Sequence, residues 1–209
     1  MPPRSPVPEA LRAVAAQQES LVCTRQCLDA GVSPNVLTRL VRSGSWSRIT
    51  AGVYDLDPTP LHARPPDRRR RRAAWAALLA FGPEAVAVGP CALALLGVAG
   101  LPSRVVPQAT LPGARGLESR DGIRLRMFDD GMTVVRVGDR YVAAPEWALA
   151  QAVPELDRPH ALRGGGEVVE RGEIRVADAQ PHREGVHGVR VGLQHFPERP
   201  GQLLSLIHI

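Results

Sequence analysis

The sequence predicts an α+β protein with two parts, because three helical segments and a β-hairpin precede a proline-rich stretch, and a mixture of helices and short strands follows it. The chain has 209 residues, of which 44% are hydrophobic and 22% charged, a length that fits one or two ordinary domains. Its longest apolar runs, residues 73–81 and 91–101, are far shorter than the roughly 20 residues of a membrane span. No signal-peptide pattern precedes Cys23, so the sequence favours a cytoplasmic protein.

The helical segments have recognisable starts. Residues 1–8 contain four prolines and are expected to form a disordered arm, and good helix formers then run from Glu9 to Ser20. A second, short helix is expected from Thr24 to Ala30. A third is expected from Pro34 to Ser43, because Ser33 is a favourable N-cap and proline suits the first helical position.

Two short alternating runs surround Ala51–Gly52, which is the pattern of a β-hairpin. Trp46 and Tyr54 are expected to pack on the helices as structural residues. Three helices followed by a small hairpin is the order of a winged helix-turn-helix, which we predict over residues 9–57. Residues 58–66 contain four prolines and are predicted to be a linker.

The second predicted domain, residues 67–156, mixes helices and strands. A strongly helical stretch that ends at Phe81 opens it, and a helix from Pro145 to Val153 closes it. A short apolar helix is expected at residues 91–98. The β-type runs lie at residues 85–88, 105–111, 122–128, 132–137 and 140–143. We expect a mixed α/β domain with a small sheet.

The pattern weakens after Leu156. Residues 157–203 are predicted to be poorly defined and partly helical, with Gly164–Gly166 interrupting a helical stretch. Residues 204–209 resemble the translation of a sequencing adapter, so we expect them to be an assembly artefact and the protein to be truncated at its C-terminus. A natural apolar tail is the alternative.

Positive charge is concentrated at the front of the chain. The 26 basic residues are all arginine, which indicates a GC-rich coding sequence. Part of the excess of positive charge is therefore explained by codon bias. Residues 1–72 hold 12 arginines and 6 acidic residues, a net charge of +6, whereas residues 73–209 hold 14 and 15, a net charge of −1. This asymmetry is typical of an N-terminal nucleic-acid-binding module with a neutral partner domain.

The third predicted helix carries the candidate DNA-binding residues, because the second helix of a helix-turn-helix enters the major groove. Its outward side chains are Asn35, Thr38, Arg39 and Arg42. Asparagine can pair with adenine, and arginine with guanine or phosphate. Ser33 at the helix start and Arg48 on the hairpin complete the set, Arg48 as a phosphate contact. The alternative is a winged helix that binds protein and carries ordinary solvated residues here.

Arg68–Arg72 is a run of five arginines at the expected start of a helix, where positive charge opposes the helix dipole. Some other interaction must offset that arrangement. Contacts of Arg68, Arg69 and Arg70 with DNA phosphates beside the winged helix would do so. A solvated, locally frayed charge run is the alternative.

Three segments of the winged-helix region carry a family resemblance: residues 21–33, 40–46 (LVRSGSW) and 51–54 (AGVY). They resemble the N-terminal domain of AbiEi-type antitoxins of type IV toxin–antitoxin systems. Residues 73–82, 93–102 and 144–153 are more weakly similar to the region that follows in actinobacterial members. It implies a transcriptional regulator that represses its own operon by binding double-stranded DNA of its promoter region. It also implies a second partner, a nucleotidyltransferase-type toxin that the protein counteracts.

The sequence predicts no catalytic residue, metal site or cofactor. Cys23, Cys27 and Cys91 lack the paired spacing of a zinc site and are expected to be free thiols, and no nucleophile elbow or phosphate loop is recognisable. We therefore expect a regulator that is not an enzyme. One alternative is the truncated front of a nuclease similar to very-short-patch-repair or restriction endonucleases, whose winged helix delivers the catalytic domain. A protein–protein interaction module is another.

Overall fold

The computed structural model describes residues 7–57, 59–113 and 118–156, and its N-terminal part is built on three helices. α1 spans Glu9–Gln17, α2 Thr24–Asp29 and α3 Pro34–Arg42. The three predicted helices are confirmed, but the first ends at Gln17 and not at Ser20, because Glu19 and Ser20 have positive φ values. The N-cap of α2 is Cys23, whose backbone N–H donates to Gln26 Oε1 at 2.9 Å. This capping box joins α2 directly to the residues before it.

A three-stranded antiparallel sheet completes the N-terminal part, in the order β1-β3-β2. β2 (Ser47–Thr50) and β3 (Val53–Asp55) are the predicted hairpin, and Gly52 in its turn has a φ of +77°. β1 (Leu21–Cys23) was not predicted, because three residues between two helices are too few to show an alternating pattern. The helices and this sheet confirm the winged-helix fold.

The two faces of this sheet pack against different parts of the protein, because successive strand residues point to opposite sides. Val22 and Tyr54 pack with the three helices and with Trp46, which is 4% exposed. The rings of Trp46 and Tyr54 have centroids 6.5 Å apart, in line with the structural role predicted for them. Leu21 and Val53 face the other way and join the core of the second domain.

The connection between the two parts is short. It contains a 3-10 turn at Leu61–Ala63, and α4 (Pro66–Phe81) follows. The predicted linker, residues 58–66, therefore overlaps the first residue of α4, where proline is well tolerated. α4 ends at Gly82, whose φ of +97° favours glycine.

The second part is built on a five-stranded mixed sheet in the order β6-β5-β4-β8-β7. β4 pairs antiparallel with β5 and parallel with β8, while the outer strands β6 and β7 pair parallel with β5 and antiparallel with β8. The elements are β4 (Val86–Ala87), α5 (Gly89–Leu95), β5 (Gln108–Thr110), β6 (Arg124–Arg126), β7 (Val134–Val137), β8 (Arg140–Ala143), α6 (Pro145–Ala152) and a final 3-10 turn, Val153–Glu155. The predicted mixed domain with a small sheet is confirmed.

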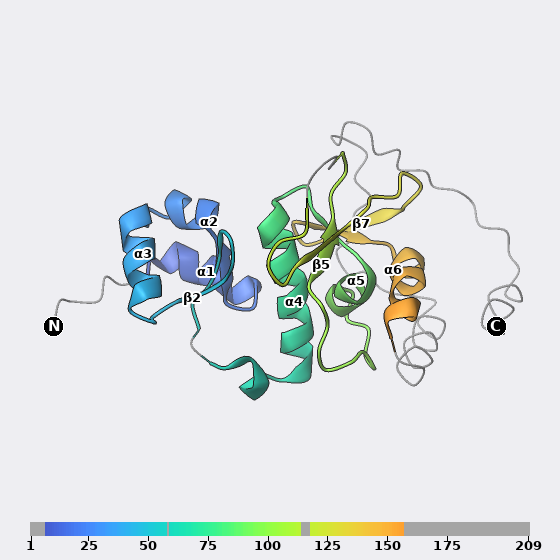
Figure 1. Ribbon diagram of the computed structural model, residues 1–209, viewed down its shortest axis with the longest axis horizontal. Helices are drawn as coiled ribbons and strands as arrows, with labels where there is room; N and C mark the ends of the chain where they lie inside the picture. The colour runs from blue at the N-terminus through green and yellow to red at the C-terminus, as the bar shows by residue number, and fades with distance from the viewer. Residues whose placement is uncertain (1–6, 58, 114–117, 157–209) are drawn as a thin grey trace, which may run out of the picture.

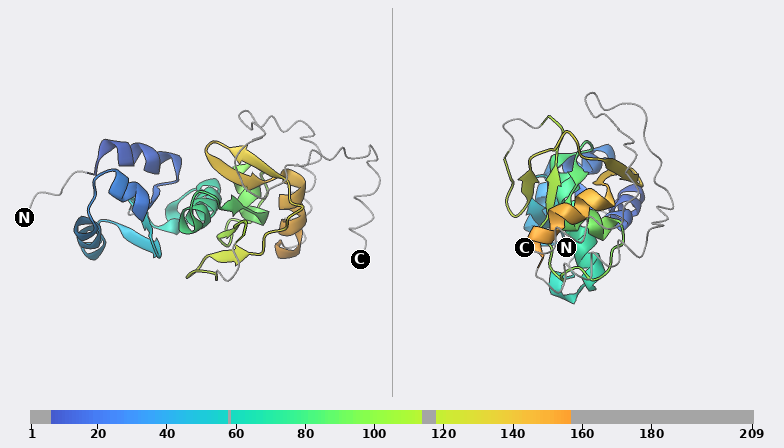
Figure 2. Two further views of the ribbon diagram at one scale, coloured as in Figure 1. Left: turned by 90° about the horizontal axis from the view of Figure 1, so that it is seen from above. Right: turned by 90° about the vertical axis from the view of Figure 1, so that its right-hand side faces the viewer.

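α4 lies between the two parts (Figures 1 and 2). It packs on β1 and β3 of the winged helix and on β4, β5 and α5 of the second domain. Its buried apolar residues are Ala73, Ala74, Ala76, Ala77, Leu78, Leu79 and Ala80. A helix that is apolar on several sides is expected where neighbours cover it on more than one side. The winged helix and the second domain therefore share one hydrophobic core through α4.

Some predictions concern residues outside the described ranges: most of the arm at residues 1–8, the partly helical segment 157–203 and the terminal segment 204–209. In the described ranges, no helix is long and apolar enough to cross a membrane.

The three cysteines are free, and burial raises the pKa of Cys27 and of Cys91 to about 12. Both of these thiols therefore stay protonated near neutral pH.

Candidate nucleic-acid interface

The turn between α2 and α3 sets the angle of the helix-turn-helix. Gly31 has a φ of +81°, and its N–H donates to the Leu28 carbonyl at 2.9 Å. The next N–H, that of Val32, donates to the Cys27 carbonyl at 2.9 Å, and the Val32 side chain is buried. Because glycine adopts a positive φ at little cost, this residue allows the chain to turn within a few residues into α3.

α3 is fixed at both ends. At its start, Ser33 Oγ accepts a hydrogen bond from the Val36 N–H at 3.5 Å, as expected for the predicted N-cap. Near its end, the Trp46 N–H donates to the Leu40 carbonyl at 3.1 Å. Leu37, 4% exposed, inserts into the core between these points. One face of the helix is therefore anchored, and the opposite face is presented outward.

The predicted contact residues of α3 all lie on this outward face. They are Ser33, Asn35, Thr38, Arg39 and Arg42, each exposed. Thr38 Oγ1 donates to the Pro34 carbonyl at 3.0 Å, so its hydroxyl oxygen can still accept a hydrogen bond. Figure 1 places α3 at the end of the molecule away from α4 and the second domain. The fold thus leaves this face open to a large partner.

The hairpin offers an exposed arginine on a strand, while the second domain contacts its turn. Arg48 on β2 is exposed, and its Nε donates to the Thr50 carbonyl at 3.3 Å. At the turn, the carbonyl of Ala51 accepts from Nη1 of Arg120 in the second domain at 3.3 Å. The Arg120 guanidinium also lies 5.4 Å from the ring centroid of Phe81. The second domain therefore holds the turn of the hairpin, and Arg48 remains its outward-facing charge.

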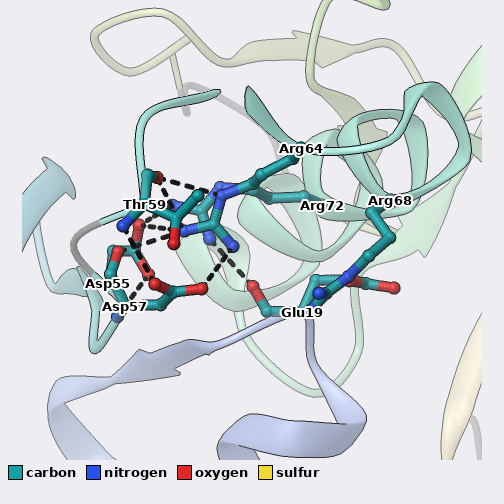
Figure 3. Close-up of polar contacts among 7 residues, drawn as sticks. All are labelled: Glu19, Asp55, Asp57, Thr59, Arg64, Arg68 and Arg72. Atoms are coloured by element: carbon teal, nitrogen blue, oxygen red, sulfur yellow. Dashed lines mark hydrogen bonds and ion pairs between the residues drawn. The ribbon is translucent and has the colours of Figure 1, made fainter. Parts of the chain in front are cut away.

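The arginine run at the start of α4 is largely engaged inside the protein. Arg68 Nε donates to Glu19 Oε2 at 2.7 Å (Figure 3), and Arg70 Nε donates to the Pro102 carbonyl at 2.9 Å. Arg69 differs, since its Nε has no hydrogen-bond partner among the described residues. These internal partners offset the unfavourable charge at the helix start. Phosphate contacts by Arg68, Arg69 and Arg70 stay a prediction, and two of these side chains already have partners in the protein.

A buried ion-pair network beside the run was missed from the sequence (Figure 3). The side chains of Asp55, Arg64 and Arg72 are 7%, 3% and 9% exposed. Arg64 Nη2 lies 3.3 Å from Asp55 Oδ2, and Arg72 Nη2 donates to the same oxygen. The only hint in the sequence is that Asp55 is two residues after the inward-facing Val53, so both side chains point to the same side of β3.

Burial dominates the electrostatics of this network. It raises the pKa of Asp55, against the opposing effects of the Asp57 N–H and the two arginines, and it lowers the pKa of Arg72. Removing either partner of a buried pair leaves an uncompensated charge, which is strongly destabilising. The network therefore holds β3 against the start of α4.

In the part of the chain that the structure describes, no three His, Cys, Asp or Glu side chains gather as metal ligands.

Comparison with known proteins bears on this geometry. Residues 9–56 match the family model described as "Transcriptional regulator, AbiEi antitoxin", a range that runs from α1 to the end of the hairpin. No curated protein matches the chain. The match covers the helix-turn-helix and the exposed face of α3, and it agrees with the resemblance in the sequence. Residues 9–56 are therefore similar to the transcriptional-regulator domain of AbiEi antitoxins, and in this protein they form the helix-turn-helix and its hairpin.

Proposed function

We propose that this protein represses its own operon by binding double-stranded DNA of its promoter region through α3, and that it counteracts a nucleotidyltransferase-type toxin. The observation that carries the first part is the exposed polar face of α3 on a domain that is similar to the regulator domain of AbiEi antitoxins. In this proposal the protein acts by binding and not by catalysis.

The outward residues have distinct roles in this proposal. Arg39 and Arg42 bind guanine edges or phosphates, and Asn35 pairs with adenine, because these side chains match the donors and acceptors in the major groove. Ser33 and Thr38 bind the sugar–phosphate backbone near the start of α3, and Arg48 binds a phosphate from β2. Among the described residues, neither Arg39 nor Arg42 has an acidic side chain within ion-pair distance, so both are available to DNA.

The second domain is proposed to be the partner-binding part. Its sheet and α4 share a hydrophobic core with the winged helix, so a toxin bound there would be carried with the DNA-binding face. Co-purification of the full chain with the toxin encoded beside it tests this role. Independent elution of the two proteins at micromolar concentration would contradict it.

The DNA-binding role is tested with the full chain and a series of salt concentrations. The probes are a duplex from the region upstream of its own gene and a scrambled duplex of the same composition. We expect tight binding to the first duplex that weakens steeply with salt, because phosphate contacts release counterions. Equal, weak binding to both duplexes would contradict repression. It would favour a module that delivers another domain or binds another protein.

Substitution of two arginines identifies the face used. Arg39→Ala with Arg42→Ala is expected to weaken binding of the upstream duplex by a few kcal/mol, since each base-reading pair is worth about 1–3 kcal/mol. The matched control replaces Arg12, on α1, and Arg104, in the second domain, which are both exposed and carry the same total charge. An equal loss in the control would overturn the assignment of α3 as the recognition helix.

A further inference from the structure

The winged helix has no net positive charge of its own. Residues 9–57 contain five arginines and five acidic residues, so their formal charges cancel. A protein that binds the phosphate backbone usually presents an excess of positive charge to it. Some other part of the chain must therefore compensate the acidic residues if this domain binds DNA.

The acidic residues are unevenly placed. Three of the five, Glu19, Asp55 and Asp57, lie beside α4, and each is ion-paired with arginines that come after residue 57 (Figure 3). The arginines of the winged helix itself are exposed: Arg12, Arg25, Arg39, Arg42 and Arg48. Residues 64–72 thus supply positive charge to the side of the winged helix that carries most of its negative charge.

Glu19 is the most heavily engaged of these acids. Its Oε2 accepts from Arg68 Nε at 2.7 Å, and its Oε1 from Arg71 Nε at 2.8 Å. Its side chain is 11% exposed, whereas those of Arg68 and Arg71 are each 43% exposed. Two partly exposed arginines therefore cover one nearly buried carboxylate.

The backbone at Glu19 adds a reason for this arrangement. Glu19 and Ser20 have φ values of +53° and +70°, a left-handed conformation that is unfavourable for L-residues. Arg72 Nη1 donates to the Glu19 carbonyl at 2.8 Å, and the Ser20 carbonyl accepts from the Leu56 N–H at 3.0 Å. α4 therefore holds the strained turn that leads from α1 into β1.

We propose that Arg68 and Arg71 support DNA binding through ion pairs within the protein: they neutralise Glu19 beside the winged helix, and they do not touch DNA. This inference rests on the proposed function. In this inference the two arginines act through the charge of Glu19, a use of the arginine run that differs from phosphate contact.

The test uses the full chain and the upstream duplex. Arg68→Gln with Arg71→Gln is expected to weaken binding by about five-fold at low salt, because uncompensated Glu19 lowers the positive potential of the domain. Adding Glu19→Gln to this pair is expected to restore the affinity to within about two-fold of the natural chain, because the charge that needed compensation is gone. Glu19→Gln alone serves as a further control and is expected not to weaken binding.

The salt dependence separates this inference from direct contact. The slope of log affinity against log salt is expected to be nearly unchanged in the Arg68→Gln, Arg71→Gln pair, whereas each lost phosphate contact lowers it by about 0.9. The control pair Arg39→Gln, Arg42→Gln is expected to lose slope and not to be rescued by Glu19→Gln.

Three results would overturn the inference. A slope reduced by nearly two units without rescue would mean that Arg68 and Arg71 touch phosphate, and wild-type affinity in the pair would mean that Glu19 needs no compensation. Absence of binding by the natural chain would overturn the proposed function as well, which distinguishes that failure from the first two. Thermal unfolding of each variant shows whether a loss of affinity comes from unfolding.

Discussion

The arginines of α3 and those of residues 64–72, in and just before the start of α4, are alike in sequence but lie in opposite environments. Arg39 and Arg42 are exposed on a face without acidic neighbours in the described ranges, whereas Arg64 and Arg72 are buried against Asp55. The difference comes from where the acidic residues of the winged helix lie, and not from the density of arginine. An arginine run is therefore evidence for nucleic-acid binding only after its acidic partners have been counted.

This difference separates two kinds of consequence. The inward arginines join two parts of the chain into one body, so their loss is expected to change the free energy of unfolding. The outward arginines contact little of the protein, so their loss is expected to change affinity for DNA and leave stability within about 0.5 kcal/mol. Each prediction below tests one side of this division.

The largest effect is expected from Asp55→Ala. This change leaves Arg64 and Arg72 buried with one partner fewer, and breaking a buried ion pair on one side costs about 3–5 kcal/mol. Urea unfolding at neutral pH measures it. The matched control is Asp29→Ala, because Asp29 pairs with Arg25 at 3.8 Å on an open surface, where the side chains are 71% and 81% exposed; its cost is expected to stay below about 1 kcal/mol. Equal losses in the two variants would remove the distinction between the inward and outward charges.

Much of the local structure could be predicted from the sequence, because local rules fix it. Ser33 as a cap, the glycine turn of the hairpin and the apolar face of α3 each depend on residues within a few positions. Partners distant in sequence could not be predicted. Arg68 and Glu19 are brought together by the packing of α4 on the winged sheet, and no pattern in either segment indicates the other.

The same reason explains which parts of the candidate site were found. The residues of α3 follow from helical periodicity, which places them opposite Leu37. β1 and the role of Asp55 depend on which side of the sheet α4 covers. Tertiary packing determines which side α4 covers. The sequence alone therefore could not decide whether the arginine run contacts phosphates or is solvated.

A smaller effect is expected from Ser33→Ala, which tests the outward side. Ser33 Oγ caps α3, and loss of a cap typically costs about 0.5–2 kcal/mol; the 3.5 Å distance to the Val36 N–H places this one at the lower end. Urea unfolding measures the loss in stability, and affinity for the upstream duplex reports the loss of a contact to its backbone. The matched control is Ser103→Ala, because Ser103 is exposed like Ser33. Thr50→Ala is unsuitable as a control, because Thr50 is buried.

The smallest effect is expected from Asp57→Asn and depends on pH. The Thr59 N–H, which donates to Asp57 Oδ1 at 2.9 Å, and the nearby Arg64 hold the pKa of Asp57 below its ordinary value of 3.8. A lowered pKa in the folded state means that the ionised form stabilises the fold above pH 3.8 and that this contribution is lost as the pH falls through the folded value. Because the side chain is 32% exposed, solvent screening limits the contribution to less than about 1 kcal/mol.

Urea unfolding of the natural chain and of Asp57→Asn between pH 3 and 6 measures this contribution. The gap between their free energies of unfolding is expected to close at the acidic end. A gap of constant size would mean that Asp57 acts through the shape of the loop and not through its charge, which would leave Asp55 and Glu19 as the acids that join the winged helix to α4.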